Sequence, residues 1–498
     1  MTHWSLDACG SLLDEARSIS WTREQLAEQV ELTAVKLRGL NVEARDSVAI
    51  VHGNSAAFVA DLLAVWSCDA TAVLLDPTSA AAEQDNLLRF FDPRVVLGEA
   101  GTARAYRGDR ADDAAGRSAD AGNADPLAII LVTSGTTGMP KAVGLSHRAL
   151  QARVACNREA IGDAAMARSL VTLATSFGHG LIGNVLTPLF AGGDVVFPAR
   201  RATLARDLGT LIDTHGITFL TGVPALWRMA LKMSGPPAGG SLRRVHVGSA
   251  PLSEQLWRDI IAWTGSETVN CYGMTEVANW FAGASSRDSA PRSGLVGRPW
   301  GGRAAVLDSS GQISASGVGE ILVHSPSMMQ GYLDRPDLTQ QCRIADWYRT
   351  GDLGIIEDDG QILLQGRLKD EINRAGTKIQ PTELDMLIES HPAVEEACAF
   401  AMPDPAAGEI VAAAIRLKDG MNASGESLAL WCGQRIRRAV DLLSRRRRQC
   451  QPRGVGGPRQ IAFAGVIGRQ IAQQEAFGRQ VHGSLAQYAH VFPPASIA

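Results

Sequence analysis

A run of hydroxyl, glycine and lysine residues follows a short apolar segment and has the composition of a phosphate-binding loop. The apolar segment, residues 127–132, leads into the sequence TSGTTGMPK, which ends at Lys141. Glycines let the backbone turn sharply and approach a ligand, and the N–H groups of such turns bind anions. The residues predicted to contact phosphate are Thr133, Ser134, Gly135, Thr136, Thr137, Gly138 and Lys141.

This loop differs from the P-loop of kinases and ATPases. The P-loop places Ser or Thr directly after its lysine, whereas Lys141 is followed by Ala142. A kinase or ATPase is therefore disfavoured. A polar turn without a ligand is the other interpretation, and the length of the matching string favours a binding loop.

The loop TSGTTGMPKAV resembles the signature loop of the adenylate-forming superfamily, which includes acyl-CoA synthetases, aryl-CoA ligases, peptide-synthetase adenylation domains and luciferases. Further blocks of that superfamily follow in the same order, and the resemblance extends from about residue 21 to about residue 436. These blocks are CYGMTE (271–276), GEILVHSPSMMQGYL (319–333), WYRTGD (347–352), GRLKD to PTE (366–383) and HPAVEEACAFAMPDPAAGE (391–409).

The resemblance implies that the protein activates a small carboxylic acid with ATP. The carboxylate would attack the α-phosphorus and displace pyrophosphate, leaving an acyl-adenylate. A thiol, either CoA or a phosphopantetheinyl carrier protein, would then take the acyl group and release AMP. Mg²⁺ is implied as well, because a hard divalent cation neutralises the charge on the phosphates.

Single residues inherit roles from the same resemblance. Glu276 would bind Mg²⁺ and Thr275 would hydrogen-bond the α-phosphate. Asp352 would accept hydrogen bonds from the ribose hydroxyls, with Arg367 also at the ribose, and Lys369 would be the hinge of a mobile C-terminal domain. The predicted catalytic residues are Lys141, Thr275, Glu276 and Lys369, and the other predicted nucleotide contacts are Gly248, Ser249, Ala250, Tyr272, Gly273 and Met274.

Residues 175–197 match the segment that lines the acid pocket in the family. Phe177 and His179 stand where acyl- and aryl-CoA ligases often have an aromatic or histidine gate, although Phe177 also suits a plain core position. No acidic residue stands where amino-acid-activating members place Asp, so an amino acid is disfavoured, and the pattern leans towards an aromatic acid. The predicted pocket residues are Phe177, His179, Thr221, Gly222, Val223 and Val277.

The elements that must position these residues alternate between helix and strand. Residues 21–77 and residues 125–290 show this alternation, which indicates parallel α/β layers. Strands and turns dominate residues 294–366, which predicts hairpins or a small β-barrel. The predicted organisation is an α/β fold with a large N-terminal domain (1–366) of layered sheets plus the small barrel, and a smaller mobile α/β domain (367–436).

Residues 437–498 resemble no block of the family. Members normally end with a segment whose lysine bridges the substrate carboxylate and the α-phosphate, but this sequence has no lysine after Lys418. Three interpretations stay open: a shifted reading frame, natural divergence with an arginine such as Arg459 as a substitute, or a basic arm for acidic partners. If that lysine stabilises transition-state charge, adenylation by this chain is expected to be slow.

Composition and charge indicate which partners and locations are disfavoured. The formal net charge of −4 over 498 residues argues against nucleic acid as the main partner. The most apolar stretch, residues 58–75, contains Asp61 and Asp69 and is predicted to be a buried helix and strand, so no membrane span is expected. Eight scattered cysteines without a CxxC pair suggest reduced thiols in a cytoplasmic protein.

The first functional hypothesis is an acid–thiol ligase. The second is an adenylate-forming enzyme that passes its acyl group to an amine or another nucleophile. The third is a nucleotide-binding homologue that lost turnover with the C-terminal lysine. The sequence identifies neither the acid nor the oligomeric state.

Overall fold

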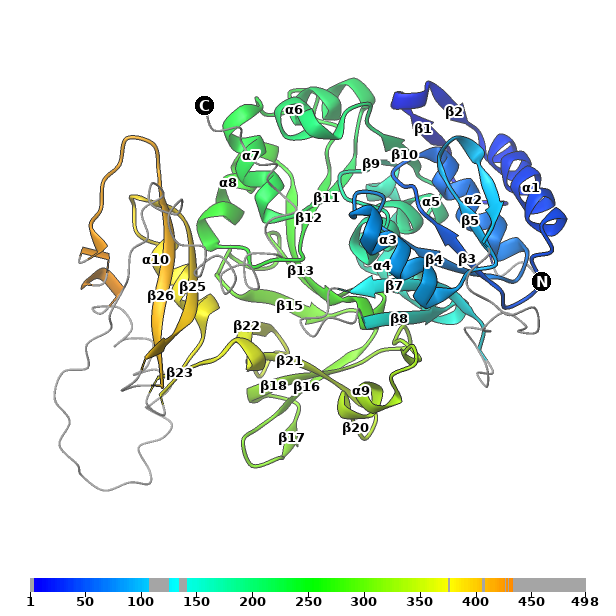
Figure 1. Cartoon of the computed structure of the whole chain (residues 1–498). Coiled ribbons are helices and arrows are strands. Elements are labelled where there is room, and N and C mark those ends of the chain that lie inside the picture. The colour runs from blue at the N-terminus through cyan, green and yellow to red at the C-terminus, as the bar shows by residue number, and fades with distance from the viewer. Residues whose placement is uncertain are drawn as a thin grey trace.

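The computed structural model describes residues 4–106, 125–133, 141–374, 377–404, 408–425, 427–428 and 430–432. Within these residues the strands form three sheets of fifteen, seven and four strands (Figure 1). The predicted loop residues Ser134–Gly138 and the segment 437–498 lie outside the described residues.

The seven-stranded sheet contains the strand that leads into the predicted phosphate loop. Its parallel strands are short, mostly apolar and buried, as is typical of strands covered on both faces. They pair in the order β7-β4-β3-β5, with β8 and β19 antiparallel beyond β7 and β6 antiparallel beyond β5. The strands are β3 (Ser47–Ile50), β4 (Thr71–Leu74), β5 (Val95–Leu97), β6 (Ala103–Ala105), β7 (Leu127–Thr133), β8 (Lys141–Ser146) and β19 (Gly331–Tyr332).

Helix α1 (Arg23–Gly39) leads into β3, α2 (Ala56–Ser67) connects β3 to β4, and α3 (Ala81–Phe91) connects β4 to β5. The buried helix and strand expected at residues 58–75 are α2 and β4. Asp61 on α2 is buried because His52 and the Thr33 hydroxyl bind its carboxylate at 2.9 and 3.0 Å. In the described part of the chain no helix is both long and apolar enough to cross a membrane.

The fifteen-stranded sheet begins with a mostly parallel half. Its strands are β1 (Leu12–Asp14), β2 (Ile19–Trp21), β9 (Arg168–Leu170), β10 (Asp194–Phe197), β11 (Phe219–Gly222), β12 (Arg244–Val247), β13 (Glu267–Met274) and β14 (Asn279–Ser285). Helices α4 (His147–Ile161), α5 (Thr187–Phe190), α6 (Leu204–His215), α7 (Pro224–Met233) and α8 (Glu254–Thr264) alternate with them. This alternation confirms the predicted α/β layers.

Antiparallel strands extend this sheet in the order β15-β22-β21-β18-β16-β17, and β20 pairs with β21. They include the hairpins that the turn residues of 294–366 predicted. The elements are β15 (Leu295–Pro299), β16 (Arg303–Leu307), β17 (Ile313–Ser314), β18 (Gly317–His324), α9 (Pro336–Gln341), β20 (Arg343–Ile344), β21 (Trp347–Ile356) and β22 (Ile362–Arg367).

The four-stranded sheet forms a separate body with its own hydrophobic core, as the left side of Figure 1 shows. Its elements are β23 (Ile372–Arg374), β24 (Thr377–Ile379), α10 (Pro381–Glu389), β25 (Val394–Asp404) and β26 (Gly408–Leu417). Ion pairs join this body to α7: Arg228 contacts Glu389 at 3.3 Å and Glu396 at 3.7 Å, and Lys232 contacts Glu395.

Candidate active site

The predicted site residues lie where neighbouring parallel strands end. Strands β11, β12 and β13 pair in parallel, and their carboxyl ends carry Gly222, Gly248 and Met274. Ligands of open α/β sheets bind at such carboxyl ends. The turn Thr275–Val277 follows β13 directly, so the sheet places the nucleotide contacts and the predicted metal ligand at one edge.

Glu276 is held by a tyrosine that sequence reasoning did not assign. The Tyr332 hydroxyl donates to Glu276 Oε1 at 2.7 Å. Because that hydroxyl has one proton, the Tyr348 hydroxyl must donate to it across their 3.0 Å contact. Lys141 Nζ lies 5.2 Å from the centre of the Tyr332 ring, since β19 pairs with β8 and aligns Tyr332 with Val143. The structure thus brings Lys141 and Glu276 to one tyrosine.

Both tyrosines remain protonated donors. Burial, and then the negative charge of Glu276, raise the pKa of Tyr332 and of Tyr348 well above the usual value for tyrosine. The Tyr332 hydroxyl therefore fixes one oxygen of Glu276, and the Tyr348 hydroxyl in turn fixes Tyr332.

The chemistry of Glu276 fits a magnesium ion that arrives with phosphates. Among the described residues, hydrogen bonds reach Oε1 of Glu276 but not Oε2, and no cluster of three His, Cys, Asp or Glu side chains could hold a metal alone. Mg²⁺ is commonly bound by one or two carboxylates together with substrate phosphates. Glu276 therefore suits that ion only when a polyphosphate supplies further oxygens.

Asp352 is the second carboxylate of the site, and unlike the half-buried Glu276 it is buried. Tyr272 donates its hydroxyl to Oδ2 at 2.6 Å and Arg367 donates Nε to Oδ1 at 2.7 Å. Strands β21 and β22 set this pair, because Asp352 faces Arg367 in their register. Burial, and then the charge of Asp352, raise the pKa of Tyr272 well above its usual value. Each carboxylate oxygen can accept a second hydrogen bond, so Asp352 can still receive ribose hydroxyls.

The turn that carries Thr275 and Glu276 is strained. Ala278 and Asn279 have φ values of 58° and 116°, a conformation that costs about 1–3 kcal/mol for a residue with a side chain. The β13–β14 register shifts at Tyr272/Gly273, and a Cβ on Gly273 would lie 2.1 Å from the Asn279 carbonyl oxygen. Gly273 is therefore required by this bulge, and such strain typically persists at functional sites.

His179 connects the predicted acid pocket to the predicted nucleotide pocket. It begins a π-helix (His179–Leu186), a form often found at functional sites. Its Nδ1 lies 2.7 Å from the Ser249 hydroxyl and its Nε2 lies 2.6 Å from the Thr221 hydroxyl. Its ring meets Trp280 edge-on with centroids 5.3 Å apart. Burial lowers the pKa of His179 to about 3, so the imidazole is neutral at neutral pH.

We expect His179→Leu to raise the KM for the acid about 10-fold, because the buried Thr221 hydroxyl and the exposed Ser249 hydroxyl both lose a partner, and leaving a buried hydroxyl unpaired costs about 1 kcal/mol or more. The KM for ATP serves as the internal control and should change less than that for the acid. Because the pKa of His179 is far below 6.5, the pH profile of the unsubstituted protein should show no break near that value from this residue. A break near pH 6.5 that disappears in His179→Leu would contradict the conclusion that the His179 imidazole is neutral.

The other predicted residues are distributed as follows. Gly248 donates its N–H to the Gly222 carbonyl at 3.2 Å, Ser249 adopts a φ of 66°, and Phe177 is 51% exposed. Val277 is fully buried in the main hydrophobic core. Lys369 is exposed on a single turn (Leu368–Asp370) between β22 and β23.

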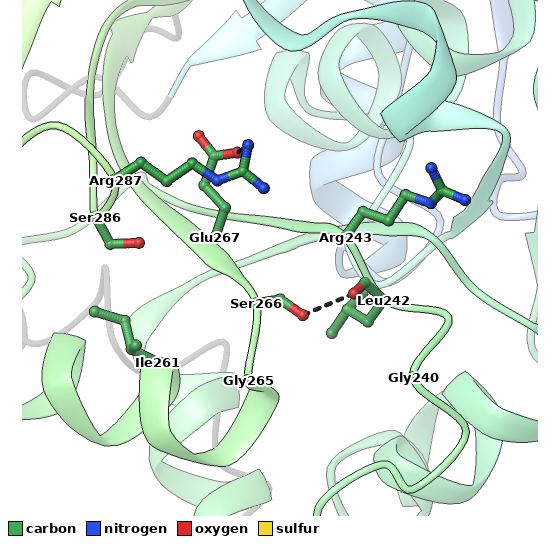
Figure 2. Close-up of a pocket in the computed structure, with 9 residues that line it drawn as sticks. All are labelled: Gly240, Leu242, Arg243, Ile261, Gly265, Ser266, Glu267, Ser286 and Arg287. Atoms are coloured by element: carbon green, nitrogen blue, oxygen red, sulfur yellow. Dashed lines mark hydrogen bonds and ion pairs between the residues drawn. The ribbon is translucent and has the colours of Figure 1, made fainter.

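A separate cleft of about 680 Å³ opens at the other end of β12 and β13 (Figure 2). Figure 2 shows Glu267 beside Arg287 on one wall and Arg243 on the other. Glu267 is already paired, with Arg244 at 3.3 Å and Arg287 at 3.4 Å. None of the predicted site residues that the structure describes lines this cleft.

Comparisons with known proteins identify the family of the chain. The AMP-binding enzyme family matches residues 11–333 and the AMP-binding enzyme C-terminal domain matches residues 383–442. A sulfoacetate–CoA ligase of Cupriavidus necator is 36% identical over 62% of this chain and 60% of its own length. An oxalate–CoA ligase of Arabidopsis thaliana is 28% identical over 83% of this chain and 87% of its own length.

Solved structures agree on the fold. The o-succinylbenzoate CoA synthetase of Bacillus subtilis, determined with its acyl-adenylate intermediate, has a TM-score of 0.74 and 23% identity, covering 87% of this chain and 90% of that one. The family match over residues 11–333 spans more than half of the chain and includes Lys141, Glu276 and Tyr332. The chain therefore belongs to the AMP-binding enzyme family, within the adenylate-forming superfamily.

Proposed function

We propose that this protein is an acid–thiol ligase that uses ATP and Mg²⁺. The observation that carries the proposal is the convergence of Lys141 and Glu276 on Tyr332, at the strand edge that also holds Tyr272. ATP and a carboxylic acid give an acyl-adenylate and pyrophosphate. The thiol of CoA or of a carrier protein then gives a thioester and AMP.

Each proposed role follows from the charge of the residue and its place in the site. Lys141 and the loop that precedes it bind the triphosphate. Glu276 would hold Mg²⁺, and that ion would supply positive charge to the leaving pyrophosphate. Asp352 and Arg367 orient the ribose, and the backbone of residues 248–250 borders the adenine. Thr275 donates its hydroxyl to the α-phosphate. These contacts hold the α-phosphorus in line with the acid carboxylate.

The proposed division of the chain follows the cores. Residues 1–366 form the nucleotide and acid domain, residues 367–436 form the smaller domain, and Lys369 is the hinge. The separate core of the four-stranded sheet and the exposure of Lys369 support this division. Rotation about the hinge would bring residues of the smaller domain, Gly376 among them, to the thiol. Gly376 lies outside the described residues.

Polar groups at the predicted acid pocket support a small polar acid. His179, Thr221 and Ser249 present polar groups, and the Asn279 amide nitrogen is buried with no hydrogen-bond partner among the described residues. The relatives named for sulfoacetate and oxalate act on short acids with two acidic ends. We therefore place short diacids ahead of the aromatic acids that the segment 175–197 suggested.

The described cysteines are free thiols, which supports a cytoplasmic location.

ATP–pyrophosphate exchange tests the function directly. The acids are sulfoacetate, oxalate and malonate in one group, benzoate and ferulate in a second, and an aliphatic long-chain acid in a third. Exchange that depends on one acid, followed by thioester mass with CoA or carrier protein, supports the ligase. Product mass with an amine in place of the thiol would support the second hypothesis. Nucleotide binding without exchange for any acid would support a binding protein that has lost turnover.

The rate of exchange is itself a prediction. Because residues 419–498 contain no lysine, we expect exchange about 100-fold or more below that of members that carry the C-terminal lysine, the cost of losing one charge-stabilising group. A fusion of residues 1–430 to the lysine-bearing end of a relative should restore it. Exchange at the level of intact members in the unmodified chain would contradict this expectation.

A further inference from the structure

A single arginine lies fully buried beneath the turn that carries Glu276. Arg153 is on α4 and has no exposed surface. Its Nε donates to the Val277 carbonyl at 3.2 Å and to the Ser327 hydroxyl at 3.1 Å, and its Nη2 donates to the hydroxyls of Ser325 and Ser327 at 3.0 and 2.6 Å. Its Nη1 donates to the Trp300 carbonyl at 3.3 Å.

These partners are all neutral oxygens. No described carboxylate forms an ion pair with Arg153, and burial lowers its pKa to about 10, so the guanidinium keeps its charge at neutral pH. A buried charge without a counter-ion is costly unless hydrogen bonds replace its water. Arg153 lies on the buried face of α4 beside the apolar Leu150 and Val154 and the polar Asn157. An apolar side chain at this position would avoid the cost of burying a charge.

The contacts of Arg153 reach Glu276 from two sides. On one side, Arg153 and the Ser327 hydroxyl both donate to the carbonyl of Val277, the residue after Glu276. On the other side, Ser325 and Ser327 begin the segment whose Met329 N–H donates to the Glu276 carbonyl at 2.7 Å. The same segment leads to Tyr332, which binds the Glu276 carboxylate. The guanidinium fork therefore fixes both the backbone of Glu276 and the strand that orients its side chain.

We propose that Arg153 is a positioning residue that holds the Glu276 carboxylate in place for its divalent metal ion. The proposal rests on the proposed function, in which Glu276 binds the metal of a metal–nucleotide complex. The proposal predicts that the affinity of the protein–nucleotide complex for the metal ion depends on Arg153. The affinity of the protein for the nucleotide without metal should not depend on it. Lys cannot replace it fully, because Lys lacks the planar fork that reaches several acceptors at once.

The test measures metal binding rather than turnover. Mn²⁺ is titrated, with electron paramagnetic resonance detection, into the full chain saturated with a non-hydrolysable ATP analogue. We expect Arg153→Met to weaken Mn²⁺ binding about 10-fold and Arg153→Lys to weaken it less, an effect of the size seen when partners of metal ligands are changed. Analogue binding in the presence of a chelator should change less than twofold in both variants.

Arg148 on the same helix provides the matched control. It is an exposed arginine paired with Asp125 at 3.0 Å, so Arg148→Met should leave Mn²⁺ affinity unchanged. Where Arg153→Met does not fold, Ser327→Ala replaces it, because that change removes a hydroxyl that links Arg153 to Val277 and keeps the charge. Unchanged Mn²⁺ affinity in a folded variant of Arg153 or Ser327 would overturn the positioning role. Absence of Mn²⁺–nucleotide binding in the unsubstituted chain would overturn the proposed function and the role of Arg153 together.

Discussion

Glu276→Gln is expected to reduce ATP–pyrophosphate exchange about 100-fold or more. The glutamine keeps the size of the side chain, and its carbonyl oxygen can still accept from Tyr332, which lies 2.7 Å from the carboxylate. What the variant loses is the negative charge that holds Mg²⁺, and losing one group that stabilises transition-state charge costs about 10²–10³ in rate. Exchange at saturating acid and ATP, measured over a range of Mg²⁺ concentrations, gives both the maximal rate and the metal requirement.

Glu254→Gln is the matched control for that change. Glu254 is at the exposed start of α8 and pairs with Arg258 at 2.7 Å, so its variant should exchange at the unsubstituted rate. The metal role of Glu276 would be wrong if its variant kept at least a third of the exchange activity with an unaltered Mg²⁺ requirement.

Asp352→Asn should weaken ATP binding about 100-fold. Asp352 is buried and binds Tyr272 and Arg367 at 2.6 and 2.7 Å. The amide keeps the shape but loses one acceptor oxygen and the charge, so the ribose hydroxyls and Arg367 lose charge-assisted hydrogen bonds worth about 1.5–3 kcal/mol each. Calorimetric titration with ATP measures the affinity, and thermal unfolding measures the accompanying loss of stability.

The hairpin that carries Asp352 also provides its control. Asp359 lies in the turn between β21 and β22 and pairs with Arg298 at 2.8 Å on the surface, so Asp359→Asn should bind ATP normally. An Asp352 variant with unaltered ATP affinity would exclude this carboxylate from the nucleotide site. A variant with normal affinity and reduced stability would assign Asp352 a purely structural role.

The sequence predicted the elements of the large body because the signals there are local. Helices and short, mostly apolar strands alternate over residues 21–77 and 125–290, and the structure confirms this alternation. The elements α3, β5 and β6 lie between those two ranges and were not predicted. The motif blocks also predicted that Glu276, Asp352 and Lys141 belong to one site, and the contacts through Tyr332, together with the shared end of β13, support that placement.

Long-range partners could not be predicted, because they depend on how distant segments pack. Tyr332 and Tyr348 were present in two recognised blocks, but only the pairing of β19 with β8 shows that Tyr332 reaches Glu276. The sequence contains one usable signal for Arg153, because this charged residue stands at a position on the buried face of α4. Its hydroxyl and carbonyl partners lie more than a hundred positions further along the chain, and no local pattern specifies them.

The junction between α7 and the four-stranded body has a consequence for the reaction cycle. Arg228 and Lys232 on one side face Glu389, Glu395 and Glu396 on the other, so the proposed rotation of the smaller body would separate opposite charges. Separation of partly exposed ion pairs becomes easier as dissolved salt screens them. Ionic strength would then act on the change between the two half-reactions, much as it governs the dissociation of two oppositely charged proteins.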